Sequence, residues 1–233
     1  WKTGGTIPNY EWDVPPYWQL YVLNFEEWSE YQEAMYELND REVCMVATTS
    51  APEGLAALFT NTKTEAIEAI FAGLLAKTRN YIVVLVAAHT EREFEFRTKM
   101  VQLILEKYGG TDLIEDGVIT PKPMHYGETV RNMLGAHAFR FSNCFQSTHG
   151  GMDTIAMAVR LAQLNQPVKQ KYIEKGVIGD DRGLGVWITS YESGHMAHLE
   201  VPTVYDPTST KSCLGYAEYQ DECNKMDLDQ ALG

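Results

Sequence analysis

The sequence predicts an α+β fold in which helices cover a mainly antiparallel sheet built from two ferredoxin-like halves. Three observations lead to this fold class. Strand-like segments alternate with segments of helical period along the chain. The run YIVVLVAA, residues 81–88, is apolar without alternation, as expected of a central strand covered on both faces. Residues 186–191 and 199–205 form two strand-like runs close together, which predicts a hairpin.

A first strand-helix-strand unit is expected near the start of the chain. Residues 17–23 are rich in β-formers and predict the first strand. Asn24 and Glu27 have the spacing of a capping box, so a helix is expected to begin there and to end near residue 40. Residues 42–48 then predict the second strand.

A second unit follows with its own capping signals. Thr62, with a glutamate three residues later, opens a predicted helix over residues 62–77. The central strand over residues 81–88 comes next. Thr90 opens a long helix in the same way, and Gly109-Gly110 is expected to end it.

The later part of the chain carries the second half. The expected elements are a connector over 111–122, a helix over 124–134, an alternating strand over 136–144, a helix over 152–164 opened by a turn at Gly150-Gly151, a connection over 165–185, the hairpin, and a final helix over 208–232.

Composition limits the partners and the compartment. Residues 1–17, rich in Gly, Pro and Trp, are expected to form an irregular lead-in, and residues 18–233 a single domain. A net charge of −13 argues against nucleic acid and against an anionic membrane as partners, since both attract clustered Lys and Arg. No run of about 18 apolar residues predicts a transmembrane helix. Four scattered cysteines without a CxxC pair, and no visible signal peptide, favour free thiols in a cytoplasmic protein.

The hairpin contains the one close pair of histidines, His195 and His198. Side chains alternate along a strand, so residues three apart share a face only where a turn or bulge intervenes, which Gly194 permits. Brought together, the two imidazoles could hold a divalent metal with Glu192 or Glu200 as third ligand. The alternative is two ordinary histidines that bond to backbone carbonyls.

Two arginines are candidates for binding a substrate carboxylate. Arg131 lies on the helix expected over 124–134, and Arg140 lies on the strand expected after it. A guanidinium binds a carboxylate through two parallel hydrogen bonds. The alternative for either residue is an ordinary surface ion pair. Nucleotide and serine-nucleophile signatures are not found, because the chain lacks GxGxxG, a Walker lysine and GxSxG.

Two stretches resemble a known family. Residues 80–110, NYIVVLVAAHTEREFEFRTKMVQLILEKYGG, are similar to the middle of the C-terminal substrate (cap) domain of FAD-linked oxidases, the relatives of glycolate oxidase large subunit, D-lactate dehydrogenase and vanillyl-alcohol oxidase. That family also has a strand, a turn with glycine and histidine, an LH pair with a strand, and a DP helix start. Here Gly194-His195, His198-Leu199 and Asp206-Pro207 occur in that order.

The resemblance implies a cap domain that lies over a flavin ring and shapes the substrate pocket. FAD would be held mainly by an FAD-binding domain N-terminal to this chain, which alone would be inactive. His198 matches a base or hydrogen-bonding group near the substrate hydroxyl, and His195 with His198 matches a metal-binding pair. Arg140 and Arg131 fall near substrate-binding cations of the family.

The expected function is therefore oxidation of an alcohol carbon, in a 2-hydroxy acid or an aromatic alcohol, by hydride transfer to FAD. The expected partners are a small hydroxylated substrate and the FAD-binding domain, and a homo-oligomer stays open. Two alternatives remain: a stand-alone ferredoxin-like binding or interaction module without a redox role, and a metal-dependent hydrolase that uses the histidine pair.

Overall fold

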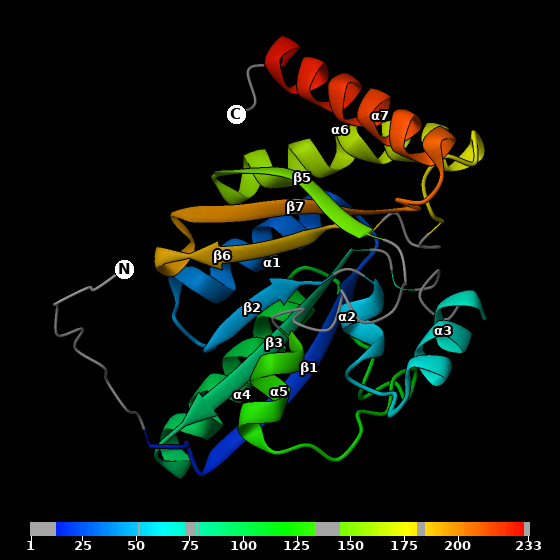
Figure 1. The fold of residues 1–233 in the computed structure, drawn as a ribbon. Coiled ribbons are helices and arrows are strands. Elements are labelled where there is room, and N and C mark those ends of the chain that lie inside the picture. Colours follow the sequence, from blue (N-terminus) through cyan, green and yellow to red (C-terminus); the bar gives the residue numbers. More distant parts are fainter. Residues whose placement is uncertain are drawn as a thin grey trace, which may run out of the picture.

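The computed structural model describes residues 13–50, 52–72, 78, 80–133, 145–180 and 185–230 (Figure 1). Its strands, in chain order, are β1 (Tyr17–Phe25), β2 (Val46–Thr49), β3 (Asn80–Ala88), β4 (Thr111–Asp112), β5 (Phe145–Asp153), β6 (Trp187–Tyr191) and β7 (Met196–Tyr205). Its helices are α1 (Trp28–Asp40), α2 (Pro52–Ala56), α3 (Lys63–Phe71), α4 (Glu91–Lys107), α5 (Tyr126–Met133), α6 (Ile155–Glu174) and α7 (Thr210–Asp229), and a single 3-10 turn, η3 (Glu192–Gly194), joins β6 to β7.

The seven strands form one antiparallel sheet in the order β4-β1-β3-β2-β6-β7-β5. The first half is β1-α1-β2-β3-α4-β4, with α2 and α3 inserted between β2 and β3. Its strands lie in the order β4-β1-β3-β2. Two split β-α-β units interleaved in this way make a ferredoxin-like half.

The second half repeats the arrangement with β5-α6-β6-β7-α7. Its strands lie in the order β5-β7-β6, so β5 corresponds to β1, β6 to β2 and β7 to β3. A counterpart of β4 does not occur among the described strands. The predicted α+β fold, with two ferredoxin-like halves and a mainly antiparallel sheet, is confirmed.

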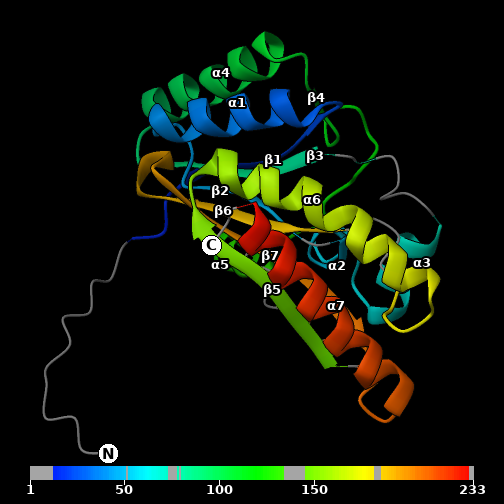
Figure 2. The ribbon, with the colours of Figure 1, turned by 90° about the horizontal axis from the view of Figure 1, so that it is seen from above.

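Helices α1, α4 and α6 cover one face of the sheet across both halves. Helix α1 contacts α4 on one side and α6 on the other, as Figure 2 shows. Leu23, Ile82, Ile188 and Leu199, from four strands, share the core beneath these helices. Helix α7 packs on α6 and reaches β7.

The opposite face is covered in the first half by α2, α3 and α5. Leu55 of α2, Ile70 of α3 and Met133 of α5 share a second core with the strand residues Val22 and Val83. Because both faces of β3 are covered, all nine of its residues are buried, which confirms the predicted central strand.

The capping residues explain where several helices begin. Thr62 and Thr90 accept hydrogen bonds from backbone N–H groups three residues on, as predicted. The cap of α1 differs, since Glu27 and not Asn24 occupies it, in a capping box with Glu30. The prediction was wrong because β1 continues in register with β3 through Phe25.

The predicted boundaries around β5 and α6 were also wrong. Gly150-Gly151 does not form a turn; both residues pair with β7 inside β5, and α6 begins after Thr154. Helix α6 then continues to Glu174, through the first part of the expected connection, because its side chains Lys169 and Tyr172 are buried. The strand expected over 136–144 lies outside the described residues.

Two further features are the membrane-spanning capacity of the described helices and the state of the cysteines. No described helix combines the length and apolarity needed to span a bilayer. Cys44, Cys213 and Cys223 are free thiols, whereas Cys144 lies outside the described residues. Burial raises the pKa of Cys44 and of Cys223 to about 12, so both thiols stay protonated at neutral pH.

Candidate functional site

Strand β7 separates an apolar face from a polar one. Ala197, Leu199 and Val201 are buried in the core beneath α1 and α6. His198 and Glu200 alternate with them and therefore point to the opposite face of the sheet. The polar residues of the hairpin thus lie on the face away from α1, α4 and α6.

His198 is held by its neighbour on the strand. Its Nε2 lies 3.2 Å from Oε1 of Glu200, and the two side chains are 36% and 21% exposed. The carboxylate and the imidazole are therefore close neighbours on the partly exposed face of the strand. The arrangement gives a partly exposed imidazole beside a carboxylate, with ring nitrogens that can form hydrogen bonds with a ligand.

Trp187 fixes the plane of the imidazole. Its ring lies parallel to that of His198, with 6.2 Å between ring centroids and 17° between planes. Trp187 belongs to β6 and pairs with Glu200 across the hairpin. The two rings and the carboxylate therefore form one group on this face, referred to below as the Trp187–His198–Glu200 group.

A buried hydroxyl cluster anchors Trp187 at the seam between the halves, where β2 meets β6. The indole Nε1–H donates to Oγ1 of Thr48 at 3.1 Å. The same Oγ1 lies 2.7 Å from Oγ1 of Thr189 and 3.0 Å from the carbonyl oxygen of Ile188. Thr48 is fully buried, so these bonds are shielded from water and hold the indole in place.

The corresponding positions in the first half carry buried side chains instead of partly exposed polar ones. When the nine-pair ladders β1–β3 and β5–β7 are aligned from their first pairs, Tyr81 aligns with His198 and Val83 with Glu200. Both are buried, and the Tyr81 hydroxyl donates to the backbone oxygen of Ser50. Helices cover this face in the first half, whereas the Trp187–His198–Glu200 group stays partly open to solvent.

His195 does not join His198. It lies in the hairpin turn, is exposed, and follows Ser193 and Gly194, whose φ angles are 55° and 88°. These left-handed residues precede β7, and β7 is regular from Met196 onward, so no bulge separates the two histidines. The described residues contain no group of three or more His, Cys, Asp or Glu side chains that could hold a metal.

The structure locates only one of the two predicted arginines. The backbone of Arg131 is on α5, at the covered face of the first half. Arg140 lies outside the described residues. Carboxylate binding by either residue remains a prediction.

Sequence reasoning missed three members of the site. Trp187 and Thr189 were counted only as β-formers of the run at residues 186–191, and Thr48 only as part of the strand expected over residues 42–48. Their meeting depends on the pairing of β2 with β6, across about 140 residues of chain. Alternation within residues 186–191 places Trp187 and Thr189 on one face and is the only local signal that could have indicated them.

Comparison with known proteins connects the fold to a family of enzymes. No protein-family model matches the chain, and no curated protein matches its sequence. Alkyldihydroxyacetonephosphate synthase shares the fold with a TM-score of 0.58 at 12% identity, over 93% of this chain and 40% of its own. p-Cresol methylhydroxylase with substrate bound gives 0.61 at 14% identity, over 90% and 43%. 4-Ethylphenol oxidase from Gulosibacter chungangensis, in an isoeugenol complex, gives 0.58 at 10% identity, over 94% and 45%.

These three proteins are FAD-linked oxidases, so the family resemblance of the sequence is confirmed at the level of the fold. The identities are too low to carry more than the fold. The chain also spans less than half the length of each of these proteins.

Proposed function

We propose that this chain is the substrate-facing portion of a flavin-dependent oxidoreductase that oxidises an alcohol carbon. The observation that carries the proposal is the Trp187–His198–Glu200 group. It is an imidazole beside a carboxylate, stacked on an indole and partly exposed on one face of a sheet. The shared fold of p-cresol methylhydroxylase and 4-ethylphenol oxidase supports it.

His198 takes the role of the group beside the substrate hydroxyl. A ring nitrogen of His198 accepts the hydroxyl proton as the alcohol carbon is oxidised. Glu200, whose Oε1 lies 3.2 Å from Nε2, helps to position the ring. Trp187 prevents the imidazole from rotating away and offers a flat apolar surface to the substrate.

FAD, when bound, accepts the hydride released from the alcohol carbon. The Trp187–His198–Glu200 group suits contact with a planar ring and a hydroxyl, and does not suit the phosphates of a dinucleotide, which a carboxylate repels. A separate FAD-binding domain is therefore part of the proposal, and the present chain alone is inactive.

The substrate is a 2-hydroxy acid or an aromatic alcohol. The flat surface of Trp187 suits an aromatic substrate, and p-cresol and 4-ethylphenol, in the names of two proteins of this fold, are aromatic. A carboxylate on the substrate would be bound by Arg140 or Arg131. Loss of activity toward acids alone in Arg140→Ala would support the first class.

The test uses the polypeptide that includes the FAD-binding domain. Purified full-length protein should be yellow, and the 233-residue chain colourless. In the full-length protein, His198→Ala should slow flavin reduction by alcohol about 10²-fold or more without releasing the flavin. His89→Ala, at an exposed histidine after β3, is the matched control and should not slow it.

Two results would contradict the proposal. One is a yellow preparation of the 233-residue chain with tightly held flavin. The other is an equal rate of flavin reduction in His198→Ala and His89→Ala, measured by the loss of flavin absorbance in stopped flow.

A further inference from the structure

Lys169 of α6 is a lysine without exposed surface. Lysine is almost never fully buried unless its nitrogen is bonded, because an unpaired charge inside a protein is costly. Its Nζ donates to the carbonyl oxygen of Pro202 in β7 at 2.8 Å and to that of Gly185, two residues before β6, at 3.4 Å. A single ammonium group therefore joins α6 to both chains of the hairpin that carries Trp187 and His198.

The two carbonyls lie where the strands of the hairpin part. Strands β6 and β7 form five pairs, and the last pair is Trp187 with Glu200. Gly185 lies two residues before that pair on one chain, and Pro202 lies two residues after it on the other. Proline has no N–H with which to extend a ladder. The two bonds of Lys169 therefore continue the connection between the strands beyond the pair that holds Trp187.

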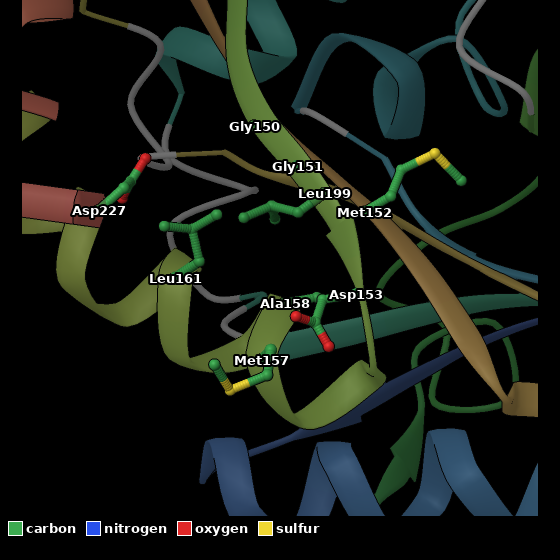
Figure 3. Close-up of a pocket in the computed structure, with 9 residues that line it drawn as sticks. All are labelled: Gly150, Gly151, Met152, Asp153, Met157, Ala158, Leu161, Leu199 and Asp227. Carbon is green, nitrogen blue, oxygen red and sulfur yellow. The ribbon is translucent and has the colours of Figure 1, made fainter. Parts of the chain in front are cut away.

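Helix α6 also supports β7 directly behind the histidine. Leu161 of the helix and Leu199 of the strand line one small pocket (Figure 3). Leu199 follows His198 in β7 and is buried in the core on the helix side. The helix is therefore attached to β7 by apolar packing at Leu199 and, three residues further on, by the bond from Lys169 to Pro202.

The closed end of the hairpin is held by a second helix. The hydroxyl of Ser190 donates to Oδ1 of Asn39 on α1 at 2.6 Å, and the hydroxyl of Ser193 donates to Oε1 of Glu42 at 2.9 Å. Ser193 and Glu42 have φ angles of 55° and 51°. Left-handed residues other than glycine persist where surrounding contacts hold them. The polar face of the hairpin therefore lies between an anchor on α1 and an anchor on α6.

The stacking of the two rings depends on the separation of β6 and β7. Trp187 stands on β6 and His198 on β7, with 6.2 Å between ring centroids. Because Trp187 is in the last pair of the ladder, its position also depends on what holds the chain just before it. Lys169 holds that chain at Gly185.

We propose that Lys169 is a positioning residue for the alcohol oxidation, an inference that rests on the proposed function. Its Nζ fixes the carbonyls of Gly185 and Pro202 and so sets the distance between Trp187 and His198. Lys169 does not touch the reacting atoms; it acts through the two strands. Without its donors the strands part beyond their last pair, and the imidazole loses its stacked position.

The first test follows the reactivity of His198 in the full-length flavoprotein without substrate. Lys169→Met keeps the apolar stem of the side chain and removes the donors. Diethyl pyrocarbonate should modify His198 about threefold faster or more in this variant than in wild type, because the strands open more often. Mass spectrometry measures the rate at each histidine, and exposed His89 should react at an unchanged rate.

The second test follows flavin reduction at saturating alcohol. Lys169→Met should slow it about tenfold or more, since a small misplacement of a reacting group is costly in rate. Lys171→Met is the matched control, because Lys171 lies on the same helix and is a half-exposed partner of Glu222 at 2.7 Å. The control should leave both flavin reduction and the reactivity of His198 as in wild type.

A variant that does not fold is replaced by Lys169→Gln. Its side chain is one bond shorter and keeps N–H donors, so the same changes should appear at smaller size. Equal reactivity of His198 in wild type and in the Lys169 variant would overturn the proposal, as would equal changes in Lys171→Met. Failure of the proposed function looks different: His198→Ala then leaves flavin reduction unaltered, while Lys169→Met still raises the reactivity of His198.

Discussion

The two halves of the molecule share the order of their strands and helices, but they differ in how far helices cover the sheet. In the first half both faces of the sheet are covered by helices, and β4 closes the outer edge. In the second half the face that carries His198 lacks a helix among the described elements, and no described strand pairs with the outer edge of β5. The comparison separates a half whose sheet is covered on both faces from a half that leaves the Trp187–His198–Glu200 group partly exposed.

The largest effect on stability is expected from exchanging the residues at one pair of aligned positions in the two halves. Val83 is fully buried in the first half, and Glu200 occupies the same position in the second. Val83→Glu should cost about 4 kcal/mol or more of unfolding free energy, because it buries a charge without a partner. Glu200→Val should change stability by less than about 1 kcal/mol, because Glu200 is partly exposed. Urea unfolding of both variants measures the difference.

Equal destabilisation by these two substitutions would show that the two halves are equally buried. The comparison on which the functional argument rests would then fail.

An intermediate effect on stability is expected at the seam between the halves, where β2 pairs with β6. Thr48→Val keeps the shape of the side chain and removes the hydroxyl that bonds Trp187 and Thr189. It should cost about 1–3 kcal/mol, since it leaves buried polar groups without partners. Thr48→Ser, which keeps the hydroxyl, is the control and should cost less. If serine were the worse replacement, packing of the methyl group and not hydrogen bonding would join the halves.

The smallest effect on stability is expected at the glutamates that join the two helices of each half. Glu37 of α1 accepts hydrogen bonds from Lys107 and Tyr108 at the end of α4. Glu222 of α7 accepts hydrogen bonds from Lys171 and Tyr172 of α6. Each helix pair is thus joined by one glutamate and a Lys-Tyr pair. Glu37→Gln and Glu222→Gln should each cost about 0.5–1 kcal/mol at pH 7.

The pH dependence of this effect follows from the carboxyl groups. The hydrogen bond from Lys107, with that from Tyr108, lowers the pKa of Glu37 from 4.5 to about 2, and Lys171 likewise lowers the pKa of Glu222. A lowered pKa contributes stability that is full above pH 4.5 and is lost as the pH falls toward about 2. The cost of Glu37→Gln, measured by denaturant unfolding, should therefore be larger at pH 7 than at pH 2. An equal cost at both pH values would mean that the charge does not contribute.

The sequence predicted what local patterns determine. The unbroken apolar run of β3 indicated a central strand, and the two β-rich runs at residues 186–191 and 199–205 indicated a hairpin. Capping threonines marked the starts of α3 and α4 because a side-chain oxygen bonds the N–H three residues on, which is a local interaction.

What the sequence did not predict depends on tertiary contact. Strand β5 contains two glycines and an aspartate, which are depleted in strands, and it exists because it pairs along its whole length with β7. The second part of α6 carries Pro167 and polar residues, and burial of Lys169 and Tyr172 maintains it as a helix. The Trp187–His198–Glu200 group could be predicted only in part, because Thr48 reaches Trp187 through the pairing of distant strands.

The central claim is that substrate meets the face that carries His198. Modification of histidines by diethyl pyrocarbonate in the full-length flavoprotein, followed residue by residue by mass spectrometry, tests it most directly. Saturating alcohol substrate should slow modification of His198 about tenfold and leave exposed His89 unchanged. Modification of His198 at the same rate with and without substrate would contradict the claim.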